Sequence, residues 1–568
     1  MSESRSKISR IVGWVKRWFS RLLSASVSAR VWLALTLVAL MSVVDIIGYY
    51  LEYSRSWIVI AGVVSFAALK GGILSLSLWL TRRWWVARVA VWLFIAGFAL
   101  LSIVNAVSYM LYDFGISTKL LAIIYETNPS EVRQFMPGLF DNLQTTMRTW
   151  RFWLIVVAIV GAFYFVGRIR RRVFNAVALS LALLGGVYFV WFVTTSRRAR
   201  TSHIIYARTA KYCGNMISDM KNMRRQMAMR RPLPDRETAV SERWAEKVVL
   251  VIGESASRDH HSVYGYPLPT TPFAQSGRDS LYVFDNALAS STATSESVPR
   301  MITFIPDGPY DGAWYEYPTL LSLFKAYGYS TYWLSNQERT GDFSNLSGIL
   351  SYDASEVRYV GSYDSEDNLT NWYDDVLLPE LRGRLRNDST AQLFSLHLMG
   401  SHVDYRQRYP RRRARFTARD VMRGTPSRPW LTESKASTVA HYDNSIAFTD
   451  SVLSEIVGTL RDLPRPAAMI YVADHGEDVY DDRDFLGRDD RFAYVPFYIY
   501  VNNAYLAAHP EMAARLRESV HTPFSTANLI HALITLTGSR YSRYDSSRDF
   551  LSPSFQARPR YVDDKPQD

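Results

Sequence analysis

Long apolar runs occupy the first 195 residues of the chain, and short apolar runs separated by polar segments occupy the rest. A helix that crosses a bilayer needs about 20 mostly apolar residues. Five runs come close to or exceed that length, at residues 31–50, 57–80, 87–111, 150–166 and 173–193. The pattern therefore predicts a five-helix transmembrane domain over residues 31–195.

Basic residues are distributed unevenly around these runs. They cluster before the first run, between the second and third, and between the fourth and fifth. Positively charged loops stay in the cytoplasm, so we expect a cytoplasmic N-terminus and a C-terminal part outside the cytoplasm. Arg197, Arg198 and Arg200 oppose this orientation, but the other loops agree on it. A cleaved signal peptide is disfavoured because 30 residues precede the first run.

Residues 1–30 combine apolar positions at helical spacing with basic residues between them. This pattern is typical of an amphipathic helix that lies on the cytoplasmic membrane surface. A basic flank that only sets the orientation of the first span explains the same residues equally well.

The chain changes character after a polar connector at residues 196–240. Beyond it, dense apolar runs of strand length alternate with helix-compatible segments; the runs are KVVLVI, YSTYWLS, QLFSLHL, AAMIYVA and VPFYIYV. This alternation predicts an α/β domain over residues 241–568 with a mostly parallel central sheet. Ligands of such sheets bind at the carboxyl ends of the strands.

The net charge bears on the binding partners of the protein, and the cysteine content bears on disulfides. The net charge is +12 and the sequence pI is about 9.5, which suits work beside an anionic membrane. We expect no nucleic-acid partner, because the domain is predicted to be exported. Cys213 is the single cysteine, so no disulfide within the chain can stabilise the domain.

Carboxylates and imidazoles follow three of the predicted strands. Glu254 follows the first, His402 the third, and Asp474 with His475 the fourth. Glu254, Asp474 and His475 would bind Zn²⁺, or Mn²⁺ if oxygen ligands dominate, and leave one coordination position open. The alternative for Glu254 alone is that it caps the following helix.

A hydroxyl-rich segment, SSTATSESVPRM, spans residues 290–301. A hydroxyl becomes nucleophilic near neutral pH only when a metal or a base activates it. One hydroxyl of this segment could therefore fill the open metal position. The spacing alone does not choose among the six, which are Ser290, Ser291, Thr292, Thr294, Ser295 and Ser297. A flexible polar loop, or a cluster that caps a helix, is the alternative.

Several motifs resemble a known family in order and spacing. They are VIGESASRDHHSVYGYPLPTTP, SSTATSESVPRM, WLSNQ, LHLMGSH, YDNSIAFTD and YVADHGEDVYD. Together they resemble the phosphoethanolamine transferases of the Gram-negative inner membrane, within the alkaline phosphatase and sulfatase superfamily. The resemblance implies that phosphatidylethanolamine is the donor and that a phosphothreonine-type intermediate forms. It also implies an acceptor in the cell envelope, such as lipid A, the lipopolysaccharide core or another glycan.

The resemblance assigns roles to individual residues. Glu254, Asp474 and His475 match the metal ligands. Alignment of TATSESVP on Ser297 puts the nucleophile, which is also a metal ligand, at Thr294.

Further residues match positions that contact the substrate. His397 and His402 match histidines that hold the transferred phosphate or a second zinc. Asn336 lies in a loop that is thought to contact the headgroup.

The sequence departs from the family at two places. Ser290 and Arg300 stand where some members carry paired cysteines around the nucleophile. Gly487 and Arg488 stand where many members carry a histidine, and Arg488 could clamp phosphate instead. The alternative for Arg488 is a solvated ion pair with neighbouring aspartates.

Other functions compete with phosphoethanolamine transfer. A glycerol-phosphate transferase of the lipoteichoic acid type shares the five spans and the ligand types. A membrane scaffold with a degenerate, metal-free site belongs to another class. A sulfatase is disfavoured, because its usual nucleophile motif is absent and Cys213 follows none of the predicted strands.

Overall fold

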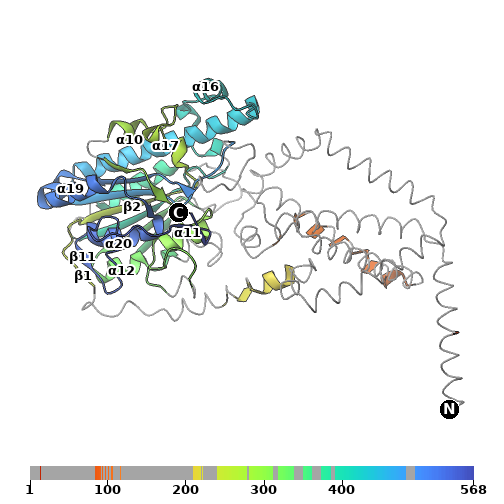
Figure 1. Cartoon of the computed structure of the whole chain (residues 1–568), viewed down its shortest axis with the longest axis horizontal. Coiled ribbons are helices and arrows are strands. Elements are labelled where there is room, and N and C mark those ends of the chain that lie inside the picture. Colours follow the sequence, from red (N-terminus) through yellow and green to blue (C-terminus); the bar gives the residue numbers. More distant parts are fainter. Residues whose placement is uncertain are drawn as a thin grey trace, which may run out of the picture. The chain divides into compact units, whose positions relative to one another are not determined.

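A computed structural model gives the architecture of the chain (Figure 1). By contacts the chain divides into two units, residues 1–125 with 136–220 and residues 126–135 with 221–568. The described residues of the second unit are 221, 239–277, 281–310, 317–337, 350–360, 373–385, 390–403, 405–480 and 493–567. In the first unit they are residue 13 and parts of 84–116 and 209–218.

The predicted membrane spans fall mostly outside the described residues. Four of them lie wholly outside, and the third is described in part, with helical residues between 85 and 105. The amphipathic segment at residues 1–30, except residue 13, and most of the connector also lie outside the described residues. Among the described residues, no helix is both long and apolar enough to cross a membrane.

The second unit is built on a seven-stranded sheet with the strand order β3-β9-β8-β2-β7-β5-β6. All five apolar runs singled out from the sequence form strands of this sheet. Their bounds are β2 (Lys247–Gly253), β5 (Ser330–Ser335), β7 (Gln392–His397), β8 (Ala467–Ala473) and β9 (Phe497–Val501). The sheet is completed by β3 (Leu281–Phe284) and β6 (Glu356–Tyr359).

The sheet is mixed, which refines the prediction of a mostly parallel one. The strands β8, β2, β7, β5 and β6 pair in parallel. By contrast, β9 runs antiparallel to both of its neighbours, β8 and β3. Pattern alone missed β3 and β6, because β3 is only four residues long and three of the four residues of β6 are exposed.

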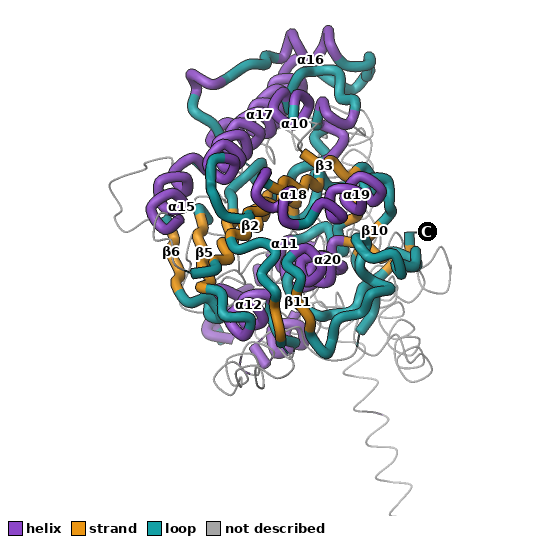
Figure 2. The backbone as a smooth tube through the Cα atoms, turned by 90° about the vertical axis from the view of Figure 1, so that its left-hand side faces the viewer, coloured by secondary structure: helices purple, strands orange, loops and turns teal. Residues whose placement is uncertain are grey.

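Helices cover both faces of the sheet (Figure 2). Alternate residues of β2 enter two separate apolar cores: Val248 and Leu250 enter one, and Val249 and Val251 the other. The first core includes side chains of α11 (Thr294–Met301), α12 (Leu320–Ala326), α18 (Asn503–Ala508), α19 (Pro510–Ser519) and α20 (Leu529–Leu536). The second includes α15 (Leu377–Leu385) and the C-terminal half of α17 (Glu433–Arg461). Burial on both faces explains why the strands read as continuous apolar runs.

Smaller elements complete the unit. The short helices are α10 (Pro272–Ser276) and α16 (Ala418–Gly424), with 3-10 turns η2 (Arg258–His260), η3 (Ser262–Tyr264), η5 (Asp374–Val376), η6 (Tyr405–Gln407), η7 (Arg411–Arg413) and η9 (Thr526–Asn528). The short strands are β1 (Val240–Ser241), β4 (Ala287–Leu288), β10 (Phe524–Ser525), β11 (Ser539–Arg540), β12 (Tyr561–Val562) and β13 (Lys565–Pro566).

The strand register places the carboxyl ends of β7, β2 and β8 side by side. Gly253 at the end of β2 pairs with Ala473 at the end of β8. On its other side, Ile252 pairs with His397, the last residue of β7. The residues that follow these strands therefore emerge at one edge of the sheet, where parallel sheets bind ligands.

Candidate active site

Glu254 leaves the end of β2 and is almost completely buried, at 2% exposure. The loop after β7 packs against the backbone of Glu254. Gly400 has a φ of +52°, and a Cβ there would lie 2.7 Å from the backbone nitrogen of Glu254. Ser401 donates its backbone N–H to the Glu254 carbonyl over 2.9 Å. Only glycine permits this close approach, so the GSH loop fixes the position of Glu254.

Asp474 and His475 follow β8 directly. Asp474 Oδ1 accepts the backbone N–H groups of Ser255 (3.1 Å) and His475 (2.7 Å). Asp474 Oδ2 is buried and accepts no hydrogen bond of ordinary geometry within the described residues. His475 Nδ1 lies 2.8 Å from the Gly476 carbonyl, so this nitrogen carries the proton and leaves Nε2 for another partner.

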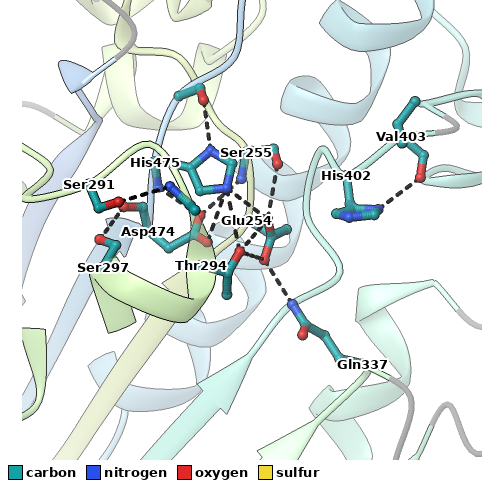
Figure 3. A network of polar contacts seen from close by, with 12 residues as sticks. Glu254, Ser255, Ser291, Thr294, Ser297, Gln337, His402, Val403, Asp474 and His475 are labelled. Atoms are coloured by element: carbon teal, nitrogen blue, oxygen red, sulfur yellow. Dashed lines mark hydrogen bonds and ion pairs between the residues drawn. The ribbon is translucent and has the colours of Figure 1, made fainter. Parts of the chain in front are cut away.

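Thr294 begins α11 and faces this cluster (Figure 3). Its Oγ1 lies 3.2 Å from both carboxylate oxygens of Glu254 and 3.4 Å from His475 Nε2. The first backbone N–H groups of a helix have no partner within the helix, and its N-terminus favours negative charge. Thr294 thus combines a hydroxyl, a carboxylate contact and an electropositive helix end.

The structure separates Thr294 from three of the other five hydroxyls of its segment. Ser291 and Thr292 donate their hydroxyls to Asp563, 2.6 and 2.9 Å away. Ser297 is fully buried and donates its hydroxyl to the Asp474 carbonyl over 2.5 Å. These contacts hold the loop and helix in place, whereas the Thr294 hydroxyl lies against Glu254 and His475.

Glu254, Asp474 and His475 each offer a ligand atom, and these atoms lie within 4.8 Å of one another. His475 Nε2 is 3.4 Å from Glu254 Oε1 and 3.5 Å from Asp474 Oδ2, longer than good hydrogen bonds. The three predicted metal-ligand side chains are therefore brought together, with one ligand atom of each close to those of the other two.

Burial and charge shift the acidity of this cluster. Burial lowers the pKa of His475, but the carboxylates of Asp474 and Glu254 outweigh it and raise this pKa to about 10. Burial and the Glu254 charge raise the pKa of Asp474 to about 7. Burial also raises the pKa of Glu254, but the nearby charged ring of His475 holds this pKa well below its usual range. Without a metal, the cluster therefore keeps a proton that partly neutralises its two carboxylates. A divalent cation would neutralise the same negative charges.

Gln337 is a site residue that sequence reasoning missed. Its Nε2 donates to Glu254 Oε2 over 3.0 Å and to the Leu398 carbonyl over 3.1 Å. Ser255 also contacts the site, because its hydroxyl donates to Glu254 Oε1 over 3.0 Å. Both residues are next to positions that the sequence had singled out, but nothing in the pattern distinguished their side chains.

Asn336, predicted to contact the headgroup, is buried next to Gln337. Its side chain donates to Asp374 Oδ1 over 2.8 Å. Asp374 in turn accepts the backbone N–H groups of Met399 (2.8 Å) and Gly400 (2.9 Å). In this structure Asn336 supports the GSH loop that presses on Glu254, and its role in headgroup binding stays a prediction.

The two predicted phosphate-binding histidines differ in environment. His397 is fully buried, and neither ring nitrogen has a hydrogen-bond partner within the described residues. Burial lowers the pKa of His397 to about 4, although the Glu254 charge opposes this shift. His402 is half-buried and lies apart from the Thr294 cluster, with Nδ1 2.8 Å from the Val403 carbonyl (Figure 3). Arg488 lies outside the described residues.

Comparison with protein families identifies this domain. The sulfatase family matches residues 246–539, just over half of the chain, and the match contains Glu254, Thr294, Asp474 and His475. The chain belongs to the sulfatase family. The resemblance to the alkaline phosphatase and sulfatase superfamily, inferred from the motifs, is confirmed.

Relatives of this sulfatase-family chain include named phosphoethanolamine transferases. EptC of Escherichia coli is 28% identical over 325 residues, which cover 56% of this chain and 55% of EptC. EptA of Helicobacter pylori is 26% identical over 483 residues, 81% of this chain and 82% of EptA. The chain spans about half the length of the first curated relatives that it matches.

Solved structures share the fold of this sulfatase-family chain. The C-terminal periplasmic domain of E. coli EptC, in complex with zinc, has a TM-score of 0.51 at 27% identity and covers 56% of this chain and 88% of that domain. The integral membrane protein EptA from Neisseria meningitidis has a TM-score of 0.60 at 18% identity, over 92% of this chain and 97% of EptA. The second likeness shows the fold alone.

Proposed function

We propose that this chain transfers phosphoethanolamine from phosphatidylethanolamine to an acceptor of the bacterial envelope, either lipid A, the lipopolysaccharide core or another glycan. One observation supports this proposal most strongly. The Thr294 hydroxyl at the start of a helix lies 3.2 Å from Glu254, beside the converging side chains of Asp474 and His475. The names of the relatives point to the same group transfer.

The residues present fit a zinc ion. The donor set combines two carboxylates and one imidazole, which zinc accepts, and manganese is the alternative. Among the described residues, buried Asp474 Oδ2 accepts no hydrogen bond of ordinary geometry, and the Gly476 carbonyl orients His475 so that Nε2 is available. Glu254, Asp474 and His475 would hold the ion, with Thr294 completing the set. When bound, zinc supplies Lewis-acid stabilisation of the developing negative charge on oxygen and phosphate.

The chemistry proceeds by two displacements at phosphorus. Thr294 Oγ1 attacks the phosphorus of phosphatidylethanolamine; a new P–O bond forms and the bond to diacylglycerol breaks. The product of this step is a phosphoethanolamine ester of Thr294. An acceptor hydroxyl or phosphate oxygen then attacks the same phosphorus and releases Thr294 unchanged. Glu254 accepts the Thr294 hydrogen bond and so orients the attacking oxygen.

Neighbouring groups bind the phosphate during both steps. The N-terminal N–H groups of α11 face the anion, as helix N-termini commonly do. We assign His397 and His402 to the phosphate oxygens and to protonation of the leaving oxygen. The two buried ring nitrogens of His397 have no hydrogen-bond partner in the part of the chain that the structure describes, which supports this assignment. Arg488 is assigned to phosphate and Asn336 to the headgroup from the resemblance alone.

The donor and acceptor require a membrane setting. We propose that residues 31–195 form a five-span domain in the inner membrane, with residues 1–30 cytoplasmic. Residues 196–240 would be a periplasmic connector, and residues 241–568 the periplasmic catalytic domain. Positive charges in the predicted cytoplasmic loops support this orientation, and the likeness in fold to EptA supports the architecture.

A donor-discrimination assay tests the proposal. The purified chain is incubated with zinc and vesicles of phosphatidylethanolamine or phosphatidylglycerol, and released diacylglycerol is quantified by mass spectrometry. We expect diacylglycerol from phosphatidylethanolamine and none from the Thr294→Ala variant. Release from phosphatidylglycerol alone would instead establish a glycerol-phosphate transferase. No bound metal and no release from either lipid would establish a scaffold.

A further inference from the structure

The last described element of the chain is a two-stranded hairpin. Strands β12 and β13 pair antiparallel around the two-residue turn Asp563-Asp564. Both turn residues have positive φ, 50° for Asp563 and 63° for Asp564. A two-residue hairpin turn with two positive φ angles is of type I′, in which glycine, asparagine and aspartate predominate. The turn therefore suits two consecutive aspartates, although a positive φ still costs each of them more free energy than it would cost glycine.

Asp563 contacts the loop that leads into α11. Its carboxylate accepts the hydroxyls of Ser291 (2.6 Å) and Thr292 (2.9 Å), and the backbone N–H of Thr292 (3.3 Å). Its own backbone N–H donates to the Ser290 carbonyl over 3.1 Å. Three consecutive residues, which end two positions before Thr294, are thus bonded to this one aspartate.

Asp564 contacts the other end of α11. Its Oδ1 lies 2.7 Å from Nη2 of Arg300, in the last turn of the helix. The Arg300 side chain is only 4% exposed, whereas the Asp564 side chain is 51% exposed. Buried charges need a partner, so this contact matters more to the helix end than an ion pair between two exposed side chains would.

The hairpin is anchored to the body of the domain. Val562 packs in a small apolar cluster with Leu288 and Ala493. Arg560, just before the hairpin, donates to the carbonyl (3.1 Å) and side-chain oxygen (2.9 Å) of Asn286. The hairpin therefore has a fixed base on β4, from which the turn reaches both ends of α11.

We propose that Asp563 and Asp564 are positioning residues that hold α11 at both ends and so fix Thr294 against Glu254. The inference rests on the proposed function, in which Thr294 is the nucleophile. Displacing a reacting atom by about 1 Å can cost about 10²-fold in rate, so the placement of α11 controls turnover. The hairpin lies beyond residues 246–539, so the match to the sulfatase family does not include it.

The decisive variant is Asp563→Gly. Glycine suits the positive φ of the turn, so the hairpin remains while the carboxylate is lost. Asp563→Asn keeps one acceptor oxygen and is the conservative variant. Asp545→Gly is the matched control, because Asp545 also accepts a serine hydroxyl and a backbone N–H, both from Ser547, but contacts neither α11 nor its loop.

Each variant of the full chain, loaded with zinc, is measured in three ways: kcat and KM for phosphatidylethanolamine, zinc content, and amide hydrogen exchange of residues 290–301. For Asp563→Gly we expect kcat to fall about 10- to 100-fold with KM within about twofold. Zinc content stays unchanged, and exchange rises in residues 290–301 but not elsewhere. For Asp563→Asn we expect values of kcat and of amide exchange between those of Asp563→Gly and the unaltered chain. For Asp545→Gly we expect the values of the unaltered chain.

Other results would overturn the proposal. Unchanged kcat and unchanged exchange would show that the carboxylate is dispensable. A raised KM with unchanged kcat would make Asp563 a substrate contact instead. Faster exchange across the whole domain, with activity falling in proportion to zinc content, would make it merely structural. If the unaltered chain transfers no phosphoethanolamine, the proposed function fails, and exchange in residues 290–301 alone decides whether the hairpin holds α11.

Discussion

Two buried histidine–carboxylate pairs in this domain are built in opposite ways. In the first, His260 Nδ1 lies 2.7 Å from Asp443 Oδ1, and Tyr266 donates its hydroxyl to Asp443 Oδ2 over 2.9 Å. In the second, His475 Nε2 lies 3.5 Å from Asp474 Oδ2, which accepts no ordinary hydrogen bond within the described residues. We call the first pair closed, because protein groups bond both carboxylate oxygens of Asp443, and the second pair open, because Asp474 Oδ2 has no such bond.

The difference separates a pair whose partners the protein itself supplies from the pair that we propose binds a metal. Leaving a buried polar atom without a partner costs about 1–3 kcal/mol, so a folded protein rarely tolerates it without a reason. His260 and Asp443 are 1% and 0% exposed, and an aromatic ring of Tyr442 packs against His260. Asp474 is as deeply buried, yet its free oxygen converges with Glu254 and His475. This convergence supports the metal site that we propose for the second pair.

The largest effect is expected from removing a charge in the open pair. Asp474→Asn should abolish zinc binding and lower the transfer rate by about 10³-fold or more. Without metal, its thermal stability should equal or exceed that of the unaltered chain, because one of two buried carboxylates that repel each other is gone. Metal analysis, transfer assays and thermal unfolding measure the three quantities. Full activity of the variant would contradict the assignment of Asp474 as a metal ligand.

Removing the carboxylate of the closed pair should lower stability and leave zinc binding and activity unchanged. Asp443→Ala leaves His260 and Tyr266 without their buried acceptor, so we expect a loss of about 3 kcal/mol in the free energy of unfolding. Zinc content and kcat per folded molecule should stay unchanged. Urea unfolding provides the stability, and Asp420→Ala, at an exposed helix cap, is a control that should cost much less. Loss of zinc from folded Asp443→Ala would erase the distinction between the pairs.

A third buried histidine, His531, has no carboxylate partner in its hydrogen bond and should make the free energy of unfolding depend on pH. His531 Nδ1 accepts the backbone N–H of Asp545 over 3.2 Å, and burial lowers the pKa of His531 to about 3. The unfolded chain, with an ordinary histidine pKa near 6.5, binds a proton that the folded chain refuses, so stability falls as the pH drops below about 6.5. Between pH 6.5 and pH 5 the loss from His531 is about 2 kcal/mol.

Urea unfolding at the two pH values measures this loss. His531→Asn keeps an acceptor near the Nδ1 position and should make the acid dependence shallower by about 2 kcal/mol. His521→Asn is the control, because the His521 side chain is 81% exposed and keeps its hydration on folding. Equal acid dependence in His531→Asn and the unaltered chain would refute the prediction.

The smallest effect is expected from the residue that steadies Glu254. Gln337→Ala removes one hydrogen bond to Glu254 Oε2, so we expect the transfer rate to fall about tenfold, or about 1.4 kcal/mol. Gln337→Glu should be worse, since it places a second carboxylate against Glu254. Steady-state rates at saturating donor compare the two. A rate for Gln337→Ala equal to that of the unaltered chain would show that Gln337 is not needed to hold Glu254.

The core of the fold follows from the sequence because its strands are buried on both faces. Continuous apolar runs predicted β2, β5, β7, β8 and β9, and the ends of β2 and β8 brought Glu254, Asp474 and His475 together. The edge strand β6 was missed, since its residues are exposed and carry no apolar pattern. The direction of β9 was also missed, because periodicity does not report strand polarity.

Side-chain direction limited the prediction of the site. Spacing left six hydroxyls open, and the choice of Thr294 came from the resemblance to a family. The structure distinguishes them by contacts with residues far away in sequence, such as Asp563 for Ser291. Asn336 was singled out, but its neighbour Gln337 reaches Glu254, because successive residues after a strand point in different directions. The hairpin at Asp563 gave no signal, since it is short and polar.

The measurement that tests the central claim most directly is the intact mass of the chain after exposure to phosphatidylethanolamine and zinc. The account predicts a mass increase of one phosphoethanolamine group on the unaltered chain, located at Thr294 by peptide mapping. It predicts no increase on Thr294→Ala, although that variant keeps Glu254, Asp474 and His475. An adduct that persists in Thr294→Ala, or that maps to another residue, would contradict the account.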